Sequence, residues 1–302
     1  MGLNIFYIKE FKCYDEILNA REKNFPKFIK KIWAGLKIKF GKFNLEDNIL
    51  ILPINKNKKV SNKKLQKIMK RIVKSNAVKC VVLSKELNLN DEFKCLLNSF
   101  NIDILDGRFL FRFVVFYVID FVLEKRNKKI QDIELSLLLN ELDDINMRTI
   151  FEFAKKVKRL NIVTNHMELF KKVEQKLYDE GIMIMISNNK RKSLLKSDIV
   201  LNLDFVEENL KEYKLNCNCT IINISSDIKI YSKGFNGINI NNYDITFENV
   251  IIDDFASEFD NKLLYESKIY GIGDFDRIFD SLASDNVAIS EVIGNKGDVI
   301  CF

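Results

Sequence analysis

The sequence predicts an α/β protein with two domains: a smaller α/β domain first, and then a doubly wound parallel sheet. Two observations lead to this prediction. Five short apolar runs follow one another in the middle of the chain. The first three of these runs are separated by two segments in which apolar residues have helical spacing. The 302 residues, 47% of them hydrophobic, are also enough for two folded cores, whereas 11 Gly and 2 Pro are too few for a linker-rich or collagen-like chain.

The N-terminal domain is expected over residues 1–128, where short apolar runs alternate with helical periods. Strands are predicted at 3–8, 51–54, 78–83 and 102–104, and helices at 11–33, 62–75 and 91–98. A long helix then begins after Gly107, and because most of its circumference is apolar we expect it to be buried. Its apolar run covers 109–123, which is shorter than the roughly 20 residues of a membrane-spanning helix.

The N-terminal quarter is strongly basic, since residues 1–80 contain 20 Lys and Arg against 6 Asp and Glu, a net charge of +14. The helix predicted at 62–75, with Ser61 as its cap, concentrates this charge on one face. That face carries Lys63, Lys64, Lys67, Lys70, Arg71 and Lys74. It can be a solvated surface, or it can contact an anionic partner such as a nucleic acid or an acidic protein.

The core of the second domain is expected over residues 129–226. Its five apolar runs lie at 133–139, 160–164, 182–186, 198–203 and 220–224. They are continuously apolar, which is typical of strands covered on both faces. Two intervening helices are predicted to bury one face each: Ile150, Phe153, Ala154 and Val157 in the first, and Leu169, Phe170, Val173 and Leu177 in the second. Ligands of such sheets bind at the carboxyl ends of the strands.

Two motifs at those carboxyl ends suggest a family. The second run ends in Val163-Thr164-Asn165-His166, and the fourth reads Ser197-Asp198-Ile199-Val200-Leu201-Asn202. This pattern resembles the Rossmann-type nucleotide-binding domain of NAD(P)-dependent oxidoreductases of the shikimate dehydrogenase and glutamyl-tRNA reductase type. The resemblance implies NAD(P) as cofactor. It also implies that Asn165 and His166, with Thr164 beside them, face a ribose or adenine phosphate, and that Asn202 lies near the reacting end.

The chain departs from that family directly after the first strand. The family has a glycine-rich turn there, whose bare backbone lets a pyrophosphate approach the helix N-terminus. Here the residues are Asn140-Glu141-Leu142-Asp143-Asp144, without glycine. The three carboxylates can cap the helix, but they repel a diphosphate. Ordinary dinucleotide binding in the usual pose is therefore not expected.

Two interpretations follow. In the first, the chain is an oxidoreductase-like protein with weakened or lost dinucleotide binding, or it binds a smaller nucleotide. In the second, it is a non-enzymatic binding or scaffold protein whose basic N-terminal helix contacts an anionic partner. The loop 187–193, which includes Lys192, can receive an anion or be a solvated loop. No catalytic residue and no metal site are indicated.

The C-terminal part, residues 227–302, contains 6 Lys and Arg against 14 Asp and Glu, a net charge of −8. We expect it to pack on the core and on the basic N-terminal domain. Asp274 is predicted to cap a helix. The six cysteines form no CxxC pair, and we expect them to be reduced in a cytoplasmic protein.

Overall fold

The structure, a computed structural model, describes residues 4–10, 12–40, 44–46, 49–52, 66–71, 78–87, 91–230, 234–248 and 256–302. The chain divides into two compact α/β units. Unit 1 comprises Met1–Phe109 and Val250–Gly273, and unit 2 comprises Leu110–Asn249 and Asp274–Phe302. The C-terminal part thus contributes to both units, and the unit limits lie at other residues than the expected domain limits at 128 and 226.

Unit 1 has a five-stranded sheet in the order β2-β3-β1-β4-β5. The strands are β1 (Asn4–Glu10), β2 (Asn44–Glu46), β3 (Ile49–Leu52), β4 (Val78–Leu83) and β5 (Asp103–Ile104). All neighbours are parallel except β2 and β3. Helix α4 (Asp91–Ser99) lies where the sequence predicts a helix, and α9 (Asn261–Ile269) joins the unit from the C-terminal part.

The single helix expected over 11–33 is wrong. The segment instead forms α1 (Tyr14–Ile17), a 3₁₀ turn at Glu22–Asn24, and α2 (Lys27–Phe40). Leu18 is extended after α1, with ψ of 138°, and Phe25 is extended before Pro26, with ψ of 152°. Proline disfavours the helical conformation in the residue before it, so a helix cannot run through this point.

Part of the predicted basic helix is described. Residues 66–71 are helical, with Ile68 and Met69 buried and Lys67, Lys70 and Arg71 exposed. The predicted cap Ser61 and the remaining lysines, Lys63, Lys64 and Lys74, lie outside the described residues. The amphipathic pattern therefore holds over the described turns.

Unit 2 has a six-stranded, fully parallel sheet in the order β11-β10-β9-β6-β7-β8. The strands are β6 (Glu134–Leu138), β7 (Arg159–Val163), β8 (Met185–Ser187), β9 (Ile199–Asn202), β10 (Thr220–Asn223) and β11 (Ile238–Ile240). Counted along the chain, this is the order 3-2-1-4-5-6 of the Rossmann fold, with its switch point between β6 and β9. The prediction of a doubly wound parallel sheet is confirmed.

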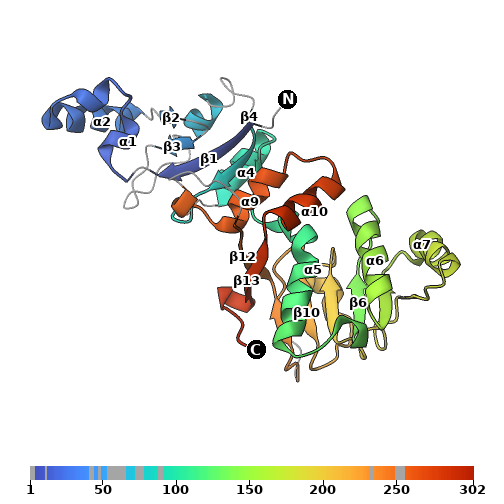
Figure 1. The fold of residues 1–302 in the computed structure, drawn as a ribbon. Helices are drawn as coiled ribbons and strands as arrows, with labels where there is room; N and C mark the ends of the chain where they lie inside the picture. Colours follow the sequence, from blue (N-terminus) through green and yellow to red (C-terminus); the bar gives the residue numbers. More distant parts are fainter. Residues whose placement is uncertain are drawn as a thin grey trace. The chain divides into compact units, whose positions relative to one another are not determined.

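Helices of unit 2 pack closely around this sheet. In α5 (Arg108–Lys125), nine side chains are buried, and Phe116 stacks on Phe153 of α6 (Asp144–Lys156) with ring centroids 4.5 Å apart. Figure 1 shows α5 and α6 beside the strands of this unit. Phe279 of α10 (Phe275–Ser284) adds a T-shaped contact to Phe113 of α5 at 5.7 Å. These aromatic contacts account for the apolar circumference of α5 within unit 2.

Two details of the helices bear on the sequence predictions. Asp274 caps α10 as predicted, because its side chain accepts a hydrogen bond from the backbone of Asp276. In α7 (Met167–Asp179), the residues predicted to face the core are buried except Leu169, which is 48% exposed. The predicted burial of Leu169, which lies in the first turn of α7, is therefore wrong.

Strands β6 and β7 are covered on both faces as expected, since every residue after the first in each strand is buried, whereas β8 is only partly buried. One of the two faces is not apolar, however. Register pairs Ser136 with Asn161, and Asn161 with Met185, so these side chains point to one face of the sheet. That face therefore carries polar residues, while the other carries Leu135, Leu137, Leu160 and Ile162. The strand predicted at 182–186 is also shifted, since β8 begins at Met185.

The chain of unit 2 ends in an antiparallel pair, β12 (Asn242–Thr246) with β13 (Ala288–Ile293). Helix α8 (Glu207–Lys211) connects β9 to β10 and packs on the sheet through Leu210. Among the described residues, no helix combines the length and hydropathy that crossing a bilayer requires.

Candidate functional site

The carboxyl end of β6 lies at the centre of the sheet of unit 2, where a Rossmann fold receives its ligand. The two residues that follow the buried end of β6 and Leu139 are Asn140 and Glu141, whose backbone N–H groups lie at this edge. Both donate to the carboxylate of Asp204, which follows β9: Asn140 N lies 2.7 Å from Oδ2 and Glu141 N lies 2.8 Å from it. A carboxylate of the protein itself thus occupies the position of an anion at this turn.

The environment of Asp204 raises its pKa above the ordinary value. Burial is the largest cause, and the nearby carboxylates of Glu141 and Asp143 act in the same direction, whereas the two backbone hydrogen bonds oppose them. The negative charge of Asp204 is therefore held by backbone dipoles in an otherwise acidic surrounding.

The N-terminus of α6 is closed by a second carboxylate. Asp143 is the N-cap, and its Oδ1 accepts a hydrogen bond from the backbone of Asn146 at 2.7 Å. Its other oxygen pairs with the guanidinium of Arg112, which also donates to Asn146 Oδ1 at 3.2 Å. The side chain of Asn146 in turn donates to the carbonyl of Glu141 at 2.9 Å. Protein groups thus bind the N–H of Asn146 at the entrance of this helix and both oxygens of its cap.

The residues predicted at the end of β7 hold the β6 and β7 loops together. Asn140 Oδ1 accepts from the backbone of Asn165 at 2.9 Å, and Thr164 Oγ1 accepts from the backbone of His166 at 3.0 Å. Thr164 is fully buried, whereas the side chains of Asn165 and His166 are exposed. His166 is the N-cap of α7, without a hydrogen bond from its side chain to the helix.

Asn202, predicted near the reacting end, is fully buried at the end of β9. Its Nδ2 donates to the carbonyl of Phe205 at 3.0 Å and to Asn223 Oδ1 at 3.1 Å, and its Oδ1 accepts from the backbone of Phe205. Both amide protons are thus used within the protein. In this geometry Asn202 is an internal, hydrogen-bonded strand residue.

Asn202 belongs to a network of buried amides across the ends of β9, β10 and β11. Asn223 Nδ2 donates to the side-chain oxygens of Asn239 and Asn241. The side-chain amides of these two asparagines both donate to the carbonyl of Ile228 and to Oδ1 of Asn295, which begins a 3₁₀ turn. A satisfied network of this kind fixes the loops rigidly.

Lys192, the last predicted residue, lies away from these groups. It is exposed and lines a cleft on the polar face of β6, β7 and β8. Asn202 lies at the same carboxyl edge of the sheet as Thr164, Asn165 and His166, since it pairs with Leu138 of β6, whereas Lys192 lies apart from them.

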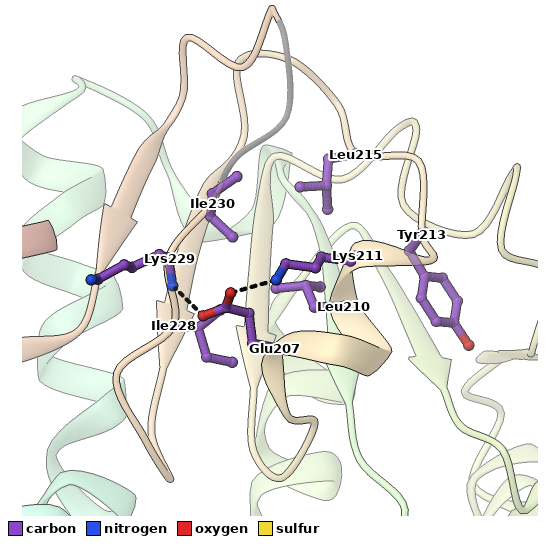
Figure 2. A pocket seen from close by; sticks show the side chains of 8 residues that line it. All are labelled: Glu207, Leu210, Lys211, Tyr213, Leu215, Ile228, Lys229 and Ile230. Carbon is purple, nitrogen blue, oxygen red and sulfur yellow. Dashed lines mark hydrogen bonds and ion pairs between the residues drawn. The ribbon is translucent and has the colours of Figure 1, made fainter.

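A second hollow of about 300 Å³ lies between α8 and residues 228–230. Figure 2 shows the carboxylate of Glu207 between the ammonium of Lys211 and the backbone N–H of Lys229, while the hydroxyl of Tyr213 points away from them. Leu210, Leu215, Ile228 and Ile230 form its apolar wall. Glu207 is already paired within one helix turn, so the one carboxylate that lines this hollow is neutralised.

Sequence reasoning missed Asp204, Asn140 and Asn223 as determinants of this region. Asn223 could have been found, because it ends an apolar run just as Asn202 does. Asp204 accepts hydrogen bonds from Asn140 and Glu141, which lie 64 and 63 positions earlier in the chain. No local sequence pattern indicates a hydrogen bond over such a distance. Among the described residues, no cluster of His, Cys, Asp or Glu could hold a metal ion.

Comparisons with known proteins give structural neighbours only. No protein-family model matches the chain, and the comparison with curated proteins finds no match. The chain is similar to the A chain of dipicolinate synthase from Bacillus subtilis, with 8% identity over 78% of this chain and 73% of that one and a TM-score of 0.39. It is also similar to L-tryptophan dehydrogenase from Nostoc punctiforme, with 12% identity over 93% and 79% of the two chains and a TM-score of 0.37.

A third neighbour is shikimate 5-dehydrogenase from Listeria monocytogenes, with 9% identity over 93% of this chain and 96% of that one and a TM-score of 0.33. At these identities and TM-scores, the likeness establishes no shared activity or ligand.

Proposed function

We propose that this chain is an oxidoreductase-like Rossmann-fold protein that has weakened or lost dinucleotide binding. One observation carries the proposal: the carboxylate of Asp204 accepts the backbone N–H groups of Asn140 and Glu141. In Rossmann domains, the N–H groups of this turn and the following helix bind the pyrophosphate of the dinucleotide. Here they are already bound to an anion.

The electrostatics of the turn support the same proposal. A diphosphate entering this position would meet Asp204, Glu141 and the cap Asp143. Two unit charges of the same sign about 5 Å apart repel each other by about 3 kcal/mol at an effective dielectric near 20. Displacing Asp204 would in addition leave a partly buried carboxylate without its two hydrogen bonds.

Thermal unfolding in low salt tests this proposal, with NAD⁺, NADH, NADP⁺ and NADPH at millimolar concentration. A ligand at 100 times its Kd stabilises a protein by about 2.7 kcal/mol, which raises Tm by several degrees. We expect no such rise. A rise of several degrees that is reduced in His166→Ala would contradict the proposal, because it would place the nucleotide at the end of β7.

The exposed lysines of residues 66–71 support the second candidate function, contact with an anionic partner. Lys67 and Lys70 are exposed beside the buried Ile68 and Met69. If this face binds nucleic acid, retention on single-stranded or duplex DNA should fall with salt and be lost in Lys67→Glu/Lys70→Glu. The matched control is Lys171→Glu/Lys172→Glu on α7, which makes the same change of charge on exposed lysines. Equal losses in both variants would contradict a specific role of residues 66–71.

A further inference from the structure

A cleft of about 390 Å³ lies on the polar face of β6, β7 and β8. Alternate residues of the three strands line it, because side chains of a strand point to the same face at every second position. These residues are Glu134 and Ser136 of β6, Arg159 and Asn161 of β7, and Met185 and Ser187 of β8, and Leu135 of β6 also borders the cleft. None of the groups at the carboxyl end of β6 contributes to it, so this cleft is separate from the turn that Asp204 closes.

The cleft exists because the crossover from β8 to β9 contains no helix. Residues 188–198 form turns, whereas crossovers between parallel strands usually form a helix that covers the sheet. Right-handed crossovers place α6 and α7 together on the opposite face. On the cleft face, Leu194 packs with Leu138, Val163 and Val200, which covers only the carboxyl half of the strands. The amino half borders the cleft instead, with Ser136 and Asn161 buried at its floor.

The floor of the cleft is polar and precisely oriented. Asn161 is 6% exposed, and its Nδ2 donates to the carbonyl of Ser193 at 2.8 Å and to Ser136 Oγ at 3.2 Å. Since a carbonyl cannot donate, this contact fixes the orientation of the amide. Asn161 Oδ1 then has no hydrogen-bond partner among the described residues. A buried acceptor without a partner costs free energy, and such groups are found where a ligand or water completes the site.

A hydroxyl pair lies next to this amide. Ser136 Oγ and Ser197 Oγ are 2.6 Å apart, and Ser136 Oγ also accepts from Asn161. One proton bridges the two hydroxyls, so the pair keeps one proton that it can donate to another acceptor. The floor thus combines one free acceptor with one free donor.

The rim is cationic. Lys192 and Lys196 are exposed and line the cleft together with Arg159. Arg159 pairs with Glu134 at 3.2 Å, so the one carboxylate lining the cleft is already neutralised. The two lysines give the opening a net positive charge, which favours an anion.

We propose that this cleft binds a small organic oxyanion, a phosphate ester or a carboxylate of metabolite size. Lys192 and Lys196 bind its charged group, the serine pair donates to it, and Met185 contacts its apolar part. A volume of about 390 Å³ is at the lower end of ligand pockets and suits a single ring or a short chain. The proposal does not depend on whether a dinucleotide binds at the end of β6.

Methyl NMR of ¹³C-labelled methionine tests the proposal, with inorganic phosphate, ribose 5-phosphate and malonate added in low salt. Met185 lines the cleft, whereas Met183 is 81% exposed and does not. We expect the Met185 methyl signal, assigned with Met185→Leu, to shift in a saturable way while the Met183 signal does not. Tighter binding of ribose 5-phosphate would identify a phosphate ester as the ligand class, and tighter binding of malonate would identify a carboxylate.

Charge-neutralising variants provide the control. Lys192→Gln/Lys196→Gln should raise the Kd about tenfold or more, while Arg191→Gln, an exposed cation on the same loop outside the cleft lining, should leave it within about twofold. All three positions are exposed, so we expect an unchanged Tm. Absence of a Met185 shift with every probe, or an equal loss of affinity in Arg191→Gln, would overturn the proposal.

Discussion

At the residue scale, the carboxylate of Asp204 is subject to opposing influences. Its carboxylate combines two backbone N–H donors with partial burial and two neighbouring carboxylates. The donors stabilise the charged form, and burial and the neighbours destabilise it. Since burial is the largest effect, the pKa of Asp204 is raised. The charged form of this carboxyl group therefore lowers the stability of the folded protein relative to the protonated form.

This raised pKa predicts the sign of a pH effect. A native carboxyl with a raised pKa binds its proton more tightly than the unfolded chain does, so its contribution to stability falls as pH rises. The window runs from the ordinary aspartate value, about 3.9, up to the raised pKa of Asp204. We expect the free energy of unfolding of the wild type, minus that of Asp204→Asn, to decrease across this window in urea titrations. A difference that grows with pH would contradict the assignment.

The cysteines give a second prediction from single residues. Burial raises the pKa of Cys80 to about 11 and that of Cys219 to about 12, and both side chains are fully buried. The remaining thiols are exposed, at Cys13, Cys95, Cys217 and Cys301. Because the thiolate is the reactive form, a thiol reagent should label four cysteines of the native protein and all six after unfolding in denaturant. Rapid labelling of Cys80 or Cys219 in the native state would contradict this burial.

At the scale of elements, Asp143 has two roles at the N-terminus of α6: it caps the helix and it forms an ion pair. The side chain accepts from the helix backbone and also pairs with Arg112, but it is 47% exposed in that pair. Loss of an N-cap costs about 1 kcal/mol, whereas an exposed ion pair contributes less. We expect Asp143→Ala to lower the free energy of unfolding by about 1 kcal/mol and Asp143→Asn, which keeps the capping oxygen, by only a fraction of that. Equal losses in urea unfolding would show that charge matters more than capping.

Most elements could be predicted from the sequence because apolar runs and helical periods are local signals. β6, β7, β9 and β10 lie within or beside their predicted runs, and α6 and α7 lie between them. The polar face of β6 and β7 could have been predicted, because Glu134 and Ser136, like Arg159 and Asn161, are two positions apart and so share one face of a strand. The leucines and isoleucines between and after them led to the prediction of continuously apolar strands. Tertiary hydrogen bonds such as those of Asp204 leave no local pattern, so they could not be predicted.

On the scale of the whole molecule, the chain crosses from one unit to the other at residues 109, 249 and 273. Unit 1 is completed by residues from the C-terminal part. Lys9, which is 8% exposed, pairs with Glu258 at 2.9 Å, and the backbone of Gly107 donates to the buried Glu266 at 2.8 Å. The acidic C-terminal part thus neutralises a buried cation within unit 1.

This arrangement predicts the effect of truncation. A chain that ends at residue 249 keeps the whole sheet of unit 1, but it leaves Lys9 with only the more distant Glu16, at 3.8 Å, and removes Phe259 and Leu263 from the apolar cluster that contains Cys80 and Val82. Losing the nearer partner of a buried cation together with two buried apolar side chains costs about 3–5 kcal/mol, a large part of the stability of a small domain. We expect such a chain to lose cooperative unfolding of unit 1, measured by hydrogen exchange of the β1 and β4 amides. Full protection of these amides in the truncated chain would contradict this role of residues 256–273.

The central claim is that Asp204 occupies the backbone N–H groups that would otherwise receive a phosphate. A pH titration of the ¹⁵N–¹H signals of Asn140 and Glu141, recorded with and without millimolar NAD⁺, tests it most directly. We predict that both amide protons titrate together with the raised pKa of Asp204, lose this titration in Asp204→Asn, and do not respond to NAD⁺. Amide signals that are insensitive to pH in this range, or that shift in a saturable way with NAD⁺, would contradict it.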